Sequence, residues 1–290
     1  MEALILSLAV AAVVGAFTLP KWRLRRALAQ PMPRHHLDIM NANIPVYRHM
    51  DAELQQQLHR LVKQFLYQKK FIGCAGQHID DEIRVTIAAQ ACMLLLNRPS
   101  RVYAGLETVL VYPSAFMAPR KHVDAAGVVT EARQDLLGES WGDGRVVLAW
   151  DHVINGALNW TEGHNVVLHE FAHQLDSESG SNNGAPWLGD PASYKRWSEV
   201  LSRDFANLQV DAMYRQQSVL DHYGASSPAE FFAVATEAFF ARPHQMASHH
   251  PQLFAEFLQY YRVDPREWLA APVQVAPESF YGQPAYGQWQ

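Results

Sequence analysis

The chain has 290 residues, of which 49% are hydrophobic and 18% are charged, a balance that excludes an intrinsically disordered chain. The length allows one large domain or two small ones. Because 24 Lys and Arg stand against 29 Asp and Glu, the formal net charge is −5, which argues against direct nucleic-acid binding through a basic patch. The two cysteines, Cys74 and Cys92, are too few for a disulfide framework, so a reducing compartment is permitted.

The first twenty residues predict a membrane anchor. Residues 3–19 carry no charge and are mostly aliphatic, and as a helix they would span about 26 Å, near the lower limit for crossing a bilayer. Basic residues follow this apolar run at Lys21, Arg23, Arg25 and Arg26, whereas a cleaved signal peptide has its positive charge in front. The positive-inside rule then predicts a single-pass protein of the cytoplasmic membrane whose body faces the cytoplasm. A signal peptide, a buried N-terminal helix and a purely cytoplasmic protein are the alternatives.

The rest of the chain predicts an α+β fold that is mostly helical, with a small sheet. Helical spacing of apolar residues predicts helices over 51–69, 80–96, 166–176, about 191–207, 228–240 and 252–262. Short apolar runs predict strands at 109–112 and 145–150. We expect four parts: an anchor over 1–20, a linker over 21–44, one globular domain over 45–270, and a disordered tail over 271–290 that is rich in Pro, Gly, Gln and Tyr.

The strongest chemical signal is the sequence HEFAH at residues 169–173, an HExxH motif inside a predicted helix. His169 and His173 are four residues apart, so they share a helix face and can reach the same metal ion. Glu170 is displaced around the helix, where it can meet a water molecule instead of the metal. Three apolar residues precede the motif, at 166–168, which argues against a solvated helix with incidental histidines. The motif therefore predicts a metal site.

A catalytic zinc ion needs a third protein ligand and an open fourth position. The metzincin continuation of the motif is excluded, because Asp176 and Ser179 stand where its glycine and third histidine would be. The candidates that remain are Glu230 and Glu237 in the helix predicted over 228–240. They are seven residues apart and share a face, so spacing alone does not separate them. The aromatic residues around both argue for a largely buried helix, where a bare carboxylate is costly.

Four segments carry a resemblance to a known family: residues 71–76, 87–95, 169–176 and 221–234. In this order they resemble the Mlc titration factor A family of zinc peptidases, over roughly residues 45–265. That family is similar in its catalytic core to the C-terminal domain of anthrax lethal factor, so the resemblance implies a zincin-like, gluzincin-type domain with one zinc ion per chain. It implies that Glu230 is the third ligand and that Tyr223 faces the site. It also implies peptidase or aminopeptidase activity on a peptide or protein substrate, and binding to a transcriptional repressor of the Mlc type. The N-terminal anchor is a departure, since the enteric member lacks one.

In the mechanism that these residues imply, Glu170 takes a proton from water and later delivers it to the leaving amine. Ligating histidines usually donate their second N–H to a carboxylate or a carbonyl, and Asp176 and Glu237 are the two candidates for that contact. For each, an ordinary helix carboxylate is the alternative. A regulatory binding protein is the alternative function: it would sequester a transcriptional repressor, with an inactive or structural zinc site.

Overall fold

The computed structural model describes residues 18–19, 22–123, 129–136, 138–141 and 144–272. The predicted anchor, apart from residues 18–19, and the predicted tail, apart from residues 271–272, lie outside these ranges. Within the described part of the chain, no helix is both long enough and apolar enough to cross a membrane.

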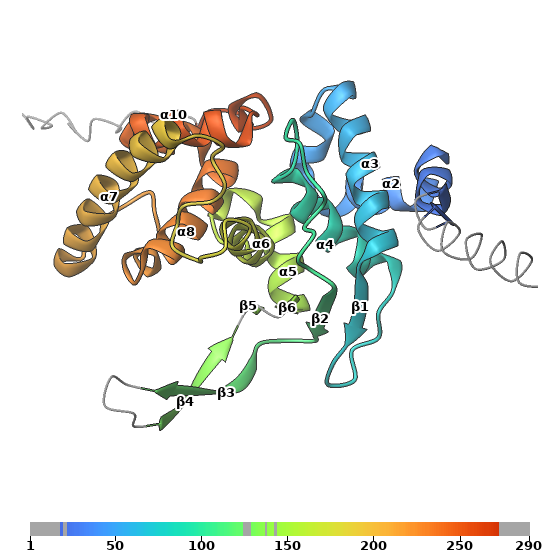
Figure 1. Cartoon of the computed structure of the whole chain (residues 1–290), viewed down its shortest axis with the longest axis horizontal. Helices are drawn as coiled ribbons and strands as arrows, with labels where there is room; N and C mark the ends of the chain where they lie inside the picture. The colour runs from blue at the N-terminus through green and yellow to red at the C-terminus, as the bar shows by residue number, and fades with distance from the viewer. Residues whose placement is uncertain (1–17, 20–21, 124–128, 137, 142–143, 273–290) are drawn as a thin grey trace, which may run out of the picture.

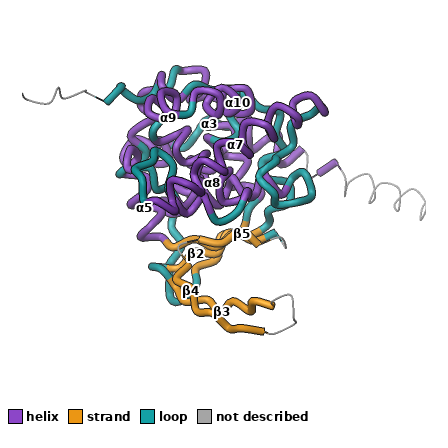
Figure 2. The backbone as a smooth tube through the Cα atoms, turned by 90° about the vertical axis from the view of Figure 1, so that its left-hand side faces the viewer, coloured by secondary structure: helices purple, strands orange, loops and turns teal. Residues whose placement is uncertain are grey.

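The described chain folds into a mostly helical body that lies on one side of a small sheet (Figures 1 and 2). Four strands form this sheet in the order β1-β2-β6-β5: β1 Lys70–Gly73, β2 Thr108–Tyr112, β6 Arg145–Ala149 and β5 Gly138–Trp141. The first three are parallel, and β5 pairs antiparallel with β6 at the edge. A separate hairpin of β3 Phe116–Val123 and β4 Val129–Leu136 projects away from the helices (Figure 1).

The helices predicted from apolar spacing are confirmed to within a few residues, apart from one that is longer. They are α3 Ala52–Gln68, α4 Asp81–Met93, α6 Val166–Ser177, α7 Pro191–Tyr214, α8 Pro228–Ala241 and α10 Pro251–Tyr261. Three more helices were not predicted from the sequence: α2 Arg34–Asn43, α5 Trp150–Leu158 and α9 Pro243–His249. Both predicted strands are present, but the second ends at Ala149 because Trp150 already begins α5. The mostly parallel sheet depends on crossovers that the local pattern does not reveal.

The interpretation of residues 21–44 as a linker is wrong for the part that forms α2. Met40 and Asn43 of this helix are buried, and α2 packs against α4. The Asn43 amide donates a hydrogen bond of 2.9 Å to the Thr86 hydroxyl, inside the contact. The packing against α4 therefore stabilises α2. The sequence alone, with a proline directly before this helix, had indicated a linker.

Two adjacent helices, α6 and α8, position the candidate site. Each begins at a residue whose side chain caps the backbone: Asn165 accepts from the Leu168 N–H at 3.0 Å, and Ser227 accepts from the Glu230 N–H at 3.2 Å. Every residue of α8 except Pro228 and Glu230 is buried. The apolar face of α6, including Leu168 and Phe171, is buried as well. Because both helices are held in the core, the polar side chains between them have little freedom to move.

Candidate active site

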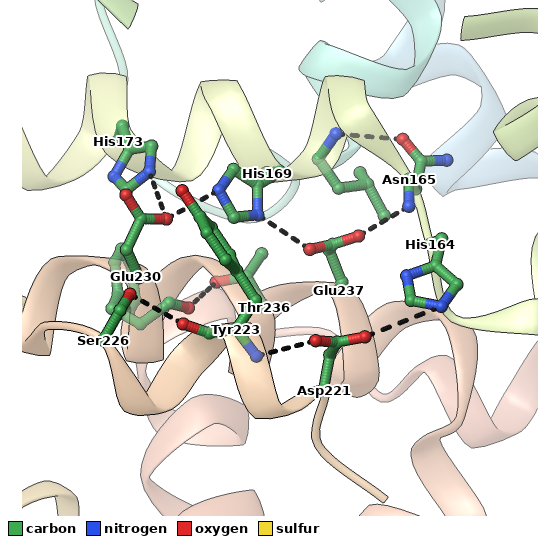
Figure 3. Close-up of polar contacts among 12 residues, drawn as sticks. His164, Asn165, His169, His173, Asp221, Tyr223, Ser226, Glu230, Thr236 and Glu237 are labelled. Carbon is green, nitrogen blue, oxygen red and sulfur yellow. Dashed lines mark hydrogen bonds and ion pairs between the residues drawn. The ribbon is translucent and has the colours of Figure 1, made fainter. Parts of the chain in front are cut away.

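Helices α6 and α8 bring two histidines and one glutamate to a common point (Figure 3). The Nε2 atoms of His169 and His173 lie 3.0 Å and 3.3 Å from the same oxygen, Oε2 of Glu230. One ligand atom from each residue lies within 4.8 Å of the other two. The two glutamates that spacing could not separate are thus in different positions, and only Glu230 meets both histidines.

This arrangement fits a zinc ion. Zinc binds imidazole nitrogen and carboxylate oxygen at about 2.0–2.1 Å, which places tetrahedral ligand atoms about 3.4 Å apart. The two N–O separations at Glu230, 3.0 Å and 3.3 Å, are close to that spacing. The Glu230 side chain is 24% exposed while His169 and His173 are more buried, so the site opens to solvent on the glutamate side. His169, His173 and Glu230 would hold the metal.

Glu237 lies on the other side of the His169 ring. Its Oε1 accepts from Nδ1 of His169 at 2.8 Å, and its Oε2 accepts from the Asn165 backbone N–H at 2.6 Å. Seven residues along α8 correspond to about 10 Å, so the two glutamates bracket the imidazole, as Figure 3 shows. A proton on Nδ1, donated to Glu237, leaves the Nε2 lone pair free to bind a metal.

Opposing effects act on the charges of this site. Burial alone would lower the pKa of His169, but its hydrogen bonds with Glu230 and Glu237 outweigh burial and raise this pKa well above its ordinary value. Burial would raise the pKa of Glu230, yet the hydrogen bonds from both histidines lower it. At both residues the hydrogen bonds between the histidines and the glutamates therefore outweigh the effect of burial.

The remaining acidic candidates on α6 are both buried. Glu170 follows His169 directly and is 5% exposed. Asp176 is fully buried, and its Oδ2 accepts from the Gly184 N–H at 2.7 Å, which ties α6 to the loop that follows it. Burial raises the pKa of Asp176, and the hydrogen bond from Gly184 opposes that effect. Its Oδ1 and Nδ1 of His173, one turn earlier, are both buried without a hydrogen-bond partner among the described residues.

Tyr223 lies beside the histidines in the short helix η3, His222–Ala225 (Figure 3). Its ring centre is 6.0 Å from that of His169, and the residue is 50% exposed. The Asp221 side chain accepts from the Tyr223 N–H at 2.7 Å and fixes the turn that carries the phenol. Since η3 packs on α8, the tyrosine is placed at the edge of the site by the element that also carries Glu230.

Sequence reasoning missed two buried amides behind the site. Asn165 does three things: it caps α6, it donates its backbone N–H to Glu237, and it donates its side-chain amide to Oε1 of Gln90 at 2.7 Å. Gln90 is fully buried in α4 and donates back to the Thr86 carbonyl at 3.1 Å. An asparagine directly before an apolar helix and a lone glutamine within an apolar one were the available signals. These contacts connect Glu237 to α4.

Comparison with known proteins agrees with this geometry. A family described as glucose-regulated metallo-peptidase M90 matches residues 19–262. The chain is 39% identical to the uncharacterised protein slr2042 of Synechocystis over 246 residues. The aligned region covers 84% of this chain and 89% of that protein. It is 32% identical over 245 residues to Mlc titration factor A of Salmonella agona, which covers 83% and 89% respectively, and the same figures hold for the Salmonella typhimurium protein. With its His-His-Glu cluster, the chain belongs to the M90 family of metallopeptidases.

Proposed function

We propose that this protein is a zinc-dependent peptidase in which His169, His173 and Glu230 hold one zinc ion and Glu170 is the general base. The observation that carries the proposal is the convergence of two Nε2 atoms and one carboxylate oxygen within 4.8 Å, in a chain of a metallopeptidase family. Glu170 is adjacent to His169 on the helix that supplies both imidazoles.

Each residue has a defined task in this proposal. When bound, zinc supplies a Lewis acid that lowers the pKa of water and polarises the scissile carbonyl. Glu170 accepts a proton from the attacking water and passes it to the leaving amine. Glu237 holds His169 in the tautomer that carries its proton on Nδ1. The Tyr223 phenol donates a hydrogen bond to the oxyanion that develops on the substrate.

The sheet supports a peptide or protein as the substrate. β5 is the edge strand of its sheet and runs beside α6. The outer edge of such a strand offers backbone N–H and C=O groups that an extended peptide can pair with. A peptide bound there would pass the helix that carries the HExxH motif. More specifically, we propose that the enzyme is an aminopeptidase, which acts on the end of such a peptide.

The first prediction separates the two glutamates of α8. Glu230→Ala should lower the zinc content by one ion per chain, because it removes a ligand. Glu237→Gln should keep that ion but weaken its affinity by about 10–100-fold, the usual effect of losing a group that orients a ligand. Elemental analysis after dialysis against buffered zinc measures both. The reverse pattern would assign the third ligand to Glu237.

The second prediction concerns hydrolysis. The purified protein should cleave amino-acid and peptide anilides, and a chelator should abolish the activity. Glu170→Gln should retain zinc and fold but lose nearly all turnover, because an amide of similar shape cannot accept the proton. Glu199→Gln, at an exposed glutamate of α7, is the matched control and should behave as the unchanged protein. Full turnover of Glu170→Gln would reject the general base.

The third prediction concerns Tyr223. Tyr223→Phe should leave zinc content and thermal stability nearly unchanged, because the residue is half-exposed. It should lower kcat/KM by roughly 10 to 10³, mainly through kcat, since the lost hydrogen bond strengthens only as charge develops. Tyr214→Phe, at a tyrosine of α7 that is 68% exposed, is the control. An unaltered kcat, on a substrate whose chemical step is rate-limiting, would remove Tyr223 from the catalytic group.

Repressor binding is the second candidate function, and the name of the relatives at 32% identity, Mlc titration factor A, favours it. In that case the protein would sequester a transcriptional repressor, and the metal would be structural. The anilide assay separates the two: the absence of any chelator-sensitive hydrolysis across a broad panel, in a chain that holds zinc, would favour the binding protein.

We also propose that residues 1–20 anchor the protein in the cytoplasmic membrane with the body in the cytoplasm, on the strength of the apolar run and the basic residues after it. The fourth prediction is that a reporter active only in the cytoplasm, fused after Gln290, works and pellets with membranes. Deleting residues 1–20 should release a folded protein. This cut leaves Leu28 and Gln30 in place, whose carbonyls accept hydrogen bonds from the Lys63 ammonium. A periplasmic chain that lacks residues 1–20 would contradict the proposal.

A further inference from the structure

A second cluster of metal-ligating side chains joins α2 to α4, and it shares no residue with the site on α6 and α8. His35 and His36 come from the first turn of α2, and Asp81 comes from the first turn of α4. The Nε2 atoms of both histidines lie near one oxygen, Oδ2 of Asp81, at 3.0 Å for His35 and 3.5 Å for His36. One ligand atom from each of the three residues lies within 4.8 Å of the other two. We propose that His35, His36 and Asp81 bind a second divalent transition-metal ion, with zinc as the reference metal.

The spacing of the three groups carries this proposal. Tetrahedral zinc ligands lie about 3.4 Å apart, and the two N–O separations, 3.0 Å and 3.5 Å, fall on either side of that value. The same pattern, two Nε2 atoms facing one carboxylate oxygen, occurs at His169, His173 and Glu230. A surface ion pair needs only one histidine at the carboxylate. Here two imidazoles converge on it.

Asp81 turns its two carboxylate oxygens to different partners, and both histidines face Oδ2. Its other oxygen, Oδ1, is 3.3 Å from a guanidinium nitrogen of Arg84, so Arg84 orients the carboxylate from the far side.

Two imidazole nitrogens and one carboxylate oxygen suit zinc, copper, nickel or cobalt better than magnesium or calcium, which prefer oxygen ligands alone. The His36 side chain is only 14% exposed, but His35 is 61% exposed, so the remaining positions of the ion face solvent. An ion held here would be more exchangeable than one at the buried site. It would also fasten α2 to the body, beside the hydrogen bond between Asn43 and Thr86.

The fifth prediction is a zinc count on the full-length chain at a buffered free zinc concentration of about 1 μM, where only sites of comparable or tighter affinity fill. The unchanged chain should hold two ions, Glu230→Ala one, His36→Ala one, and the double variant none. Asp81→Asn is a second variant that keeps the shape of the side chain and should also lose one ion. His78→Ala, at an exposed histidine outside the cluster, is the control and should keep both.

Two further readouts separate ligation from a purely structural effect. In the Glu230→Ala background, zinc should raise the unfolding temperature by a few degrees, and His36→Ala should remove that rise without lowering the zinc-free unfolding temperature comparably. Cobalt added to the Glu230→Ala chain should produce visible d–d bands that His36→Ala abolishes. Because His36→Ala is also measured in the otherwise unchanged chain, this test holds whether or not Glu230 is a ligand. A zinc content that is the same with and without His36 would overturn the proposal.

Discussion

The imidazole of His169 lies between two carboxylates of α8, and the rest of the candidate site depends on that placement. Glu237 accepts from Nδ1 at 2.8 Å and Glu230 faces Nε2 at 3.0 Å, so the ring is held from both ends. The second oxygen of Glu237 is occupied by the Asn165 N–H, at the start of the helix that carries His169. The orientation of the metal-facing nitrogen is therefore coupled to the start of α6.

Burial explains why this arrangement is stable. Almost all of α8 is buried, and a buried carboxylate without partners is costly, so Glu237 is tolerated only because both of its oxygens accept hydrogen bonds. Asn165 extends the network to Gln90, which is buried in α4. Three helices thus share one set of polar contacts, and moving any of them would leave a buried group unpaired.

The two His-His-carboxylate clusters of this chain differ in surroundings more than in geometry. At α6 and α8 the histidines are largely buried, and a second carboxylate, Glu237, fixes His169. At α2 and α4 one histidine is mostly exposed, and an arginine, Arg84, orients the carboxylate. In the first cluster Glu170 directly follows His169 and is buried. In the second, Glu82 directly follows Asp81, and its Oε1 accepts from the Asn43 amide at 3.1 Å.

The sequence alone determined the long helices, because apolar residues recur along them at helical spacing. It also determined the HExxH pair, because residues four apart lie on the same face of an α-helix. The tertiary structure decided the rest. Spacing along α8 could not separate Glu230 from Glu237. The two glutamates differ in which nitrogen of the His169 imidazole, on α6, each one contacts. The segment of α2 was interpreted as a linker, because the packing on α4 that stabilises this helix is a tertiary contact. The cluster of His35, His36 and Asp81 had no signal in the chain order either, because its residues come together only when those two helices pack.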